Sequence, residues 1–202
     1  MVNRGWVALL GLWVLSRLCL SQEPIVVRNG RALSLAFLRL APRLDVLSKN
    51  EKRSEWRLLV ANDVRNAFSG KGERVFEDDE VTRLEAILSK GLGNKTELSI
   101  CLPFEAIGGG FLDPLIAEWH ANVLKWNRRE REGQPFGRSV IETPGNRTFG
   151  SAAGLGDVSM QLDHDWFGRT VSVAIKVPTG DPTKLLGSGG IDLGIGLGMP
   201  LW

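Results

Sequence analysis

The stretch Ile191-Asp192-Leu193-Gly194-Ile195-Gly196-Leu197-Gly198 decides the fold class of this chain. Large aliphatic side chains occupy its odd positions, and aspartate or glycine occupies its even positions. Strict alternation of this kind is typical of a β-strand with one apolar face and one polar or small face. The alternate glycines indicate a crowded polar side, where small residues let a lid or plug approach the strand.

The same alternation recurs upstream, so the sequence predicts an all-β chain. No apolar run after residue 21 approaches the ~20 residues that a membrane-spanning helix needs. Regular strands are predicted at Glu97–Leu102, Asp157–Asp163, Val171–Val177 and Ile191–Gly198, and less regular ones at Ala32–Leu40, Trp56–Asn62 and Val81–Lys90.

The apolar faces of these strands fit two architectures. In a soluble sandwich they would meet in a core, and in a membrane barrel they would face lipid. The connections favour the barrel, because residues 91–96 and 166–170 make short turns while residues 103–154 and 178–190 make long loops. Outer-membrane barrels sort their connections in this way. We therefore expect an antiparallel, up-and-down transmembrane β-barrel, with a soluble periplasmic β-sandwich as the alternative.

One amphipathic helix is predicted inside the long loop, at Phe111–Trp126. Its apolar residues recur at helical spacing, and Asp113-Pro114 suits a helix N-terminus. Trp119 and His120 lie on this helix. The helix could pack as a lid on the barrel mouth, which we favour, or lie on the membrane as an interfacial foot with Trp119 at headgroup level.

Residues 1–21 have the layout of a secretory signal peptide, with Arg4 followed by a short apolar run and small residues near Ser21. We therefore expect export, with residues 22–202 forming one barrel domain in the bacterial outer membrane or, in the alternative, a periplasmic protein. Loss of the signal removes Arg4 and Arg17 and leaves 23 basic and 23 acidic residues. A neutral chain argues against nucleic acid as a partner.

Four motifs in order carry a resemblance to a known family. They are Val60-Ala61-Asn62-Asp63, Gly109-Gly110-Phe111-Leu112-Asp113 with Trp119-His120, Gly154-Leu155-Gly156-Asp157-Val158, and Lys176-Val177-Pro178-Thr179-Gly180-Asp181 with Leu186-Gly187-Ser188-Gly189-Gly190-Ile191-Asp192. They resemble the bacterial barrel family known as domain of unknown function 3187. The resemblance implies an outer-membrane barrel and no established activity. With about seven strands, where such barrels use at least eight, the chain is expected to lack C-terminal strands.

The last motif contains the candidate site. Lys176 has the parity of the barrel interior, as do Asp157 and Asp192, so the three predict a charged patch in the lumen. Internal pairing is the expected role, because buried charges need partners, and solute contact comes second. Thr179 and Asp181 are expected to order the turn at the rim.

Catalysis has little support in the sequence. There is no Gly-x-Ser-x-Gly, no His-x-x-x-His and no cysteine pair, so no catalytic residue, metal site or cofactor is predicted. An outer-membrane lipid hydrolase that uses His164 remains a third hypothesis. The acidic run Glu77–Glu80 is interpreted as a solvated loop rather than a cation site.

The leading functional hypothesis is therefore passive transport or binding of a small solute. The expected partners are outer-membrane lipid and the barrel-assembly machinery. Lipopolysaccharide is a further expected partner, because cations of the long loop could meet its phosphates, namely Arg128, Arg129, Arg131 and Arg138.

Overall fold

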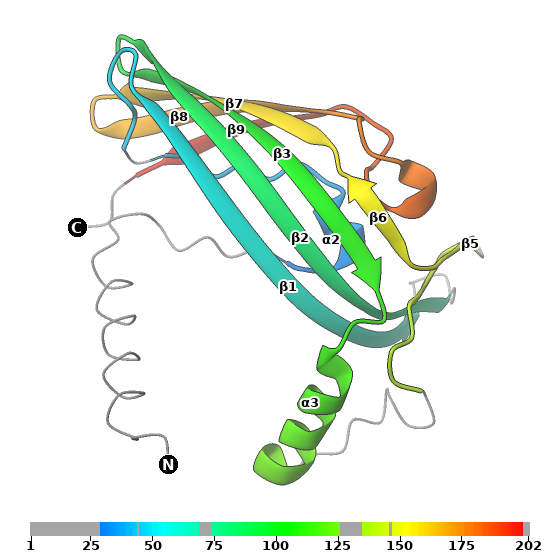
Figure 1. Ribbon diagram of the computed structural model, residues 1–202. Helices are drawn as coiled ribbons and strands as arrows, with labels where there is room; N and C mark the ends of the chain where they lie inside the picture. Colours follow the sequence, from blue (N-terminus) through cyan, green and yellow to red (C-terminus); the bar gives the residue numbers. More distant parts are fainter. Residues whose placement is uncertain (1–28, 44, 69–73, 126–134, 146, 200–202) are drawn as a thin grey trace, which may run out of the picture.

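The computed structural model describes residues 29–43, 45–68, 74–125, 135–145 and 147–199. They form one antiparallel sheet of nine strands that curves into a half-barrel (Figure 1). The predicted signal peptide and the chain end at residues 200–202 lie outside the described residues. The strands are β1 (Lys52–Phe68), β2 (Arg74–Gly93), β3 (Thr96–Gly108), β4 (Val140–Thr143), β5 (Arg147–Phe149), β6 (Ala152–Leu155), β7 (Val158–Trp166), β8 (Arg169–Val177) and β9 (Asp192–Gly198).

Two meanders make up most of the sheet. Strands β1, β2 and β3 pair in sequence, β7 pairs with β3, and β8 and β9 follow. The short strands β4 and β6 extend the sheet beside β2 and β3. Within the described residues, β1 and β9 each pair on one side only, so the observed sheet is an open half-barrel.

Tight turns gather at one end of the sheet. Asn94 and Lys95 connect β2 to β3, and Phe167 and Gly168 connect β7 to β8, all four with positive φ. Turns with positive φ at both central residues match the twist of antiparallel strands. The long connections after β3 and after β8 leave from the opposite end (Figure 1). The sorting of short and long connections that the sequence predicted is therefore observed.

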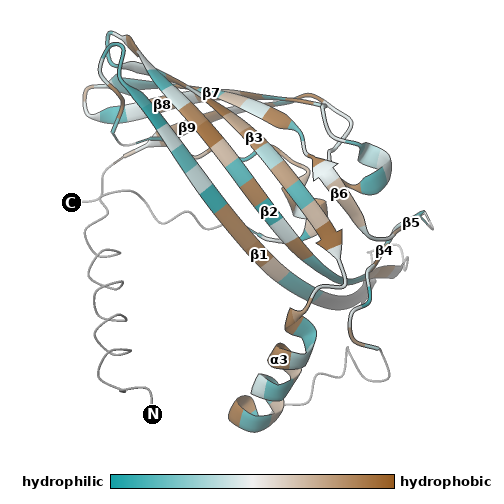
Figure 2. Ribbon diagram, in the orientation of Figure 1, coloured by the Kyte–Doolittle hydropathy of each residue, from teal (hydrophilic) through white to brown (hydrophobic). Residues whose placement is uncertain are grey.

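The two faces of the sheet differ sharply in polarity. Along β1–β3 polar and apolar residues form successive bands (Figure 2). The apolar side chains of this alternation project from the convex face and are 39–81% exposed. They are Trp56, Leu58, Val60, Leu84, Leu88, Leu102, Phe104, Met160, Leu162, Val173, Leu193, Ile195 and Leu197. The soluble sandwich predicted that such faces would be buried together, and in the described residues they are not.

The register aligns these apolar residues into rows. Ile100 pairs with Met160, Met160 with Ile175, and Ile175 with Leu193, so one continuous row crosses four strands. Because side chains alternate with period two, every odd position of β9 joins the same surface. We call this surface the outer face and the opposite, concave surface the inner face.

Three sequence-based predictions need correction. Residues Ala32–Leu40 are not a strand: α2 (Ala32–Leu35) is a single helical turn, and the residues after it run extended against the inner face. The loop expected at 103–154 contains the end of β3 and all of β4, β5 and β6. The acidic run Glu77–Glu80 is not a solvated loop but part of β2, with each residue at most 4% exposed.

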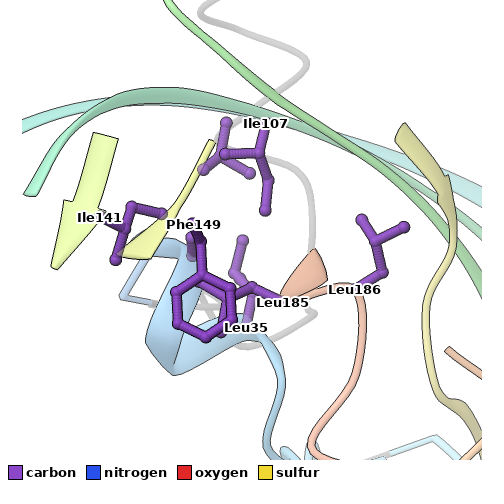
Figure 3. Close-up of a cluster of buried hydrophobic side chains, with 8 residues drawn as sticks. Leu35, Ile107, Ile141, Phe149, Leu185 and Leu186 are labelled. Atoms are coloured by element: carbon purple, nitrogen blue, oxygen red, sulfur yellow. The ribbon is translucent and has the colours of Figure 1, made fainter. Parts of the chain in front are cut away.

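An apolar cluster closes the end of the inner face where the long connections lie. Leu35 of α2 packs there with Ile107 of β3, Ile141 of β4 and Phe149 of β5 (Figure 3). Leu185 and Leu186 come from the loop after η3 (Pro182–Lys184), a 3₁₀ turn. At this end of the sheet the inner-face residues of the strands, such as Val81 and Ile107, are apolar. A small hydrophobic core therefore forms here and not along the whole sheet.

The predicted loop helix forms, but it does not cover the sheet. It consists of α3 (Leu112–Trp119) and a π-helical turn, η1 (His120–Leu124), and it projects away from the strands (Figure 1). Leu115, Trp119 and Val123 are 52–60% exposed, so the predicted lid is wrong for the described residues. No helix in the described part of the chain is long and apolar enough to cross a membrane.

Candidate functional site

The inner face is lined with charged side chains that are almost completely buried. Arg83, Glu97, Glu105, Asp163 and Lys176 each expose less than 7% of their surface. Burial of an isolated charge costs several kcal/mol or more, so such groups are stable only when they pair and hydrogen-bond. The inner face is therefore a network of compensated charges rather than a hydrophobic core.

Lys176 lies at the centre of the predicted patch. Its Nζ lies 2.6 Å from Asp157 Oδ2 and 3.2 Å from Asp192 Oδ2. The backbone explains the second contact, because Lys176 of β8 and Asp192 of β9 are direct partners across the sheet. Nζ also donates to the carbonyl of Ala36 at 2.9 Å and to the Ser188 hydroxyl. The structure thus brings the three predicted lumen residues together, in the internally paired arrangement.

Asp157 occupies the turn between β6 and β7 and organises its surroundings. Burial opposes its ionisation, but hydrogen bonds from Lys176 and from the backbone N–H of Ser188 and Gly180 outweigh that effect. The pKa of the Asp157 carboxyl consequently lies below its usual range. This carboxylate fastens the loop after β8 to the start of β7.

The rim residues Thr179 and Asp181 stabilise this loop locally. The Thr179 hydroxyl donates to Gly156 O and accepts from the Val158 N–H, both at 2.9 Å. Asp181 caps η3 by accepting from the backbone N–H and the hydroxyl of Thr183. These bonds lower the pKa of the exposed Asp181 carboxyl. Both side chains therefore form hydrogen bonds in and around the turn in which the sequence analysis placed them.

A feature that the sequence did not predict runs through the concave side. Residues 29–43 and 45–50, which we call the inner segment, follow the inner face from the apolar cluster toward the tight turns (Figure 1). The backbone N–H groups of this segment bond to side chains of the sheet. Leu38 donates to Asp192 and Leu47 to Glu97, at 2.8 and 2.9 Å, and Ala41 exchanges bonds with the Gln161 amide.

Ion pairs fasten the inner segment at two further points. Arg31 Nε lies 2.9 Å from Asp63 Oδ2 and 2.8 Å from Glu77 Oε2 at the acidic end of β1 and β2. Arg43 Nη1 lies 2.7 Å from Glu55 Oε1 near the middle of the sheet. Charges on the segment are therefore matched to charges on the wall along its length.

Glycines of the sheet make room for the inner segment. A Cβ at Gly194 would lie 2.6 Å from Leu40 Cδ1, and one at Gly91 would lie 1.9 Å from the Ser48 carbonyl oxygen. The alternate glycines of β9 do let another part of the chain approach the wall, as their spacing indicated. The part that approaches is the inner segment and not the loop helix.

A cavity of about 390 Å³ remains between the inner segment and the sheet. This is the size of a site for a small molecule. Its wall combines cations with apolar side chains and includes Cys101, the free cysteine of β3. The cavity lies next to the Lys176 cluster, because Asp157 and Lys176 both line it.

The other residues singled out in the sequence lie away from the cavity. Trp119 is exposed on α3 while His120 is buried, with ring centroids 5.4 Å apart. His164 is exposed at the end of β7, where its Nδ1 lies 2.9 Å from the Thr96 hydroxyl. The described residues contain no group of three or more His, Cys, Asp or Glu side chains that could hold a metal ion.

The basic cluster of the long loop is only partly described. Arg138 lies over the Phe76 ring, 5.3 Å from its centroid. Residues 128–131 fall outside the described residues.

Comparison with known proteins gives one match. The sequence pattern of the family described as protein of unknown function (DUF3187) matches residues 26–201. This confirms the resemblance seen in the four motifs. No curated protein and no solved structure matches the chain.

Proposed function

We propose that this chain, which belongs to the DUF3187 family of proteins of unknown function, is an exported outer-membrane β-barrel protein, or the wall of one, that binds or passes a small solute. The observation that carries the proposal is the polarity of the two faces of the sheet. Its outer face is aliphatic and exposed, and its inner face is charged and buried. A soluble protein would have the opposite arrangement.

The free energy that the outer face would gain by burial supports lipid as the surrounding medium. About a dozen large apolar side chains on the outer face are roughly half exposed. Burial of each would contribute about 1 kcal/mol, and together about 10 kcal/mol, which is comparable to the net stability of a typical domain. A face of this kind in water would also drive aggregation.

The dimensions also fit a bilayer. On β3 the apolar outer positions extend from Leu98 to Ala106, nine residues. At ~3.3 Å per residue and a tilt of about 40°, such a strand covers about 23 Å along the membrane normal, close to the ~25 Å apolar band of outer-membrane barrels.

The loop helix fits the second role considered for it, an interfacial foot. Glu80 Oε2 accepts from the backbone N–H of Phe111 and Leu112, and Asp113 accepts from the Asn62 amide. Asn62 and Glu80 are outer-face positions directly beyond Val60, where the apolar band ends. Under this proposal α3 starts at headgroup level and turns its exposed apolar residues to lipid.

The position of the inner segment indicates where a solute would bind. It occupies the concave side that a pore would need, and a cavity of about 390 Å³ lies beside it. Solute would therefore bind in this cavity, and passage would require the segment to shift.

The testing experiment is a gel of outer-membrane fractions from cells that express the protein, loaded with and without boiling. Closed barrels resist detergent until they are heated, so we expect a heat-dependent change in mobility in the outer-membrane fraction. Protein that remains in the soluble periplasm would refute the proposal. The Val173→Glu variant (middle of the outer face) and the Lys184→Glu variant (exposed loop) are a matched pair, and only the first should reduce the heat-shifted band.

A further inference from the structure

We infer that the cavity beside the inner segment binds a small organic anion that carries a short apolar chain. This inference rests on the proposed solute-binding function and specifies its ligand. It follows from the charges that the wall presents, the positions of their counterions and the apolar side chains between them.

The wall of the cavity is predominantly cationic. Arg39 and Arg43 come from the inner segment, Arg57 from β1, Arg83 from β2 and Lys176 from β8. Only two carboxylates, Glu85 and Asp157, line the same space. Five cations against two anions around one cavity create a field that favours an anionic ligand.

Most counterions of these cations do not line the cavity. Glu55 pairs with Arg43 and Arg57, Glu105 pairs with Arg83, and Asp192 pairs with Lys176. None of these three carboxylates lines the cavity. The counterions thus neutralise the cations enough to make burial tolerable, while the cationic groups keep contact with the cavity.

Arg57 is the residue best placed to bind the anionic group. It bonds Glu55 Oε2 through Nη2 at 2.9 Å. Its direct partner across the sheet, Glu85, is engaged by Arg83 Nε at 2.8 Å. Among the described residues no other bond of Arg57 is formed, so its Nε and Nη1 protons can donate to a ligand. A guanidinium fork suits a carboxylate because two parallel bonds can form.

The apolar part of the wall selects the rest of the ligand. Leu35 and Leu38 of the inner segment line the same cavity as Leu59 of β1 and Ile87 of β2. These side chains accept a short hydrocarbon chain and offer nothing to a strongly hydrated inorganic ion. The combination therefore points to a monoanion with an apolar tail.

The test compares hexanoate with hexanamide, a neutral analogue of similar size, on purified full-length protein by titration calorimetry. We expect hexanoate to bind at least tenfold more tightly than hexanamide. Arg57→Gln should weaken hexanoate binding about tenfold or more without changing hexanamide binding, because it removes a charge-assisted bond. Arg169→Gln, an exposed cation at the start of β8 outside the cavity, should leave both affinities unchanged.

Arg39→Gln provides a second variant outside the sheet, and it should also weaken hexanoate binding selectively. Equal affinities for the two probes, tighter binding of hexylammonium, or no binding of hexanoate would each overturn the inference. These failures are distinct from failure of the proposed function. A protein that shows the heat-dependent shift in the outer membrane but does not prefer hexanoate is a barrel with another ligand.

Discussion

Lys176 Nζ lies 2.6 Å from Asp157 Oδ2, and each side chain is only 3% exposed. The pair connects the end of β8 to the loop that follows it, since Asp157 also accepts from the backbone of Ser188 and Gly180. Removal of one partner would leave an uncompensated charge that is almost completely buried.

Lys176→Met should therefore lower the free energy of unfolding by about 3–5 kcal/mol, the usual cost of breaking a buried ion pair. Lys184→Met is the control, because the side chains of Lys184 and Asp181 are 61% and 38% exposed, and a solvent-exposed pair contributes little to stability. Urea titration of both variants in lipid vesicles measures the difference. Equal losses of unfolding free energy in the two variants would mean that the buried pair contributes no more to stability than the exposed pair.

The same aspartate predicts a pH dependence. Its pKa is lowered in the folded state, so its ionised form stabilises the fold. The contribution is present in full above the unfolded-state pKa of about 3.9 and is lost as pH falls through the lower folded-state value. The stability difference between the wild type and Asp157→Asn should be constant from pH 7 to about 5 and should shrink only below about pH 4. A difference that fades between pH 7 and 5 would contradict this.

The sequence predicted β8 and β9 well, because one alternating pattern indicated both their type and which face each side chain joins. Ile191–Gly198 and Val171–Val177 form strands within two residues of the predicted bounds. Their parity also predicted that Lys176 and Asp192 share the inner face. The ends of β1 and β2 were missed because Asn62, Asp63 and the run Glu77–Glu80 make both faces polar there, which removes the alternation.

The inner segment could not be predicted from periodicity. It has no regular structure beyond α2, and its backbone is satisfied by side chains more than a hundred residues away, such as Asp192 and Gln161. The one local signal was on the other side of the contact, in the alternate glycines of β9. The cavity was missed for the same reason, because a third of the residues that line it belong to this segment.

Substitution of a glycine under the inner segment should loosen the segment. A Cβ at Gly91 would overlap the Ser48 carbonyl oxygen, a backbone atom that cannot rotate away. Gly91→Ala should therefore displace residues 47–50 and expose the segment to proteases. Gly108→Ala is the control, because its nearest neighbour is Gly110 N at 3.9 Å. Limited proteolysis followed by mass spectrometry should show new cleavage between residues 29 and 50 in the first variant only.

Trp119 should lie at the level of the lipid headgroups. It is 52% exposed at the C-terminal end of α3, a helix whose N-terminus is held by the outer-face residue Glu80. In vesicles, lipids brominated near the headgroup should quench part of the protein fluorescence, and Trp119→Phe should remove that part. Lipids brominated at the chain ends should give little difference between the two proteins. Identical quenching of both proteins by every lipid would place the helix in water.

The sharpest test of the membrane assignment is a charge on the outer face. Val173 is the central outer residue of β8 and is 51% exposed, so in water Val173→Arg would change stability by less than about 0.5 kcal/mol. In a bilayer the same arginine would lie near the midplane and should cost about 2–4 kcal/mol. Phe167→Arg, at the 89% exposed tip of the turn between β7 and β8, should cost about 1 kcal/mol or less in either setting. Urea unfolding in vesicles, compared for the two variants, separates these cases. A neutral effect at Val173 would mean that this face does not contact lipid.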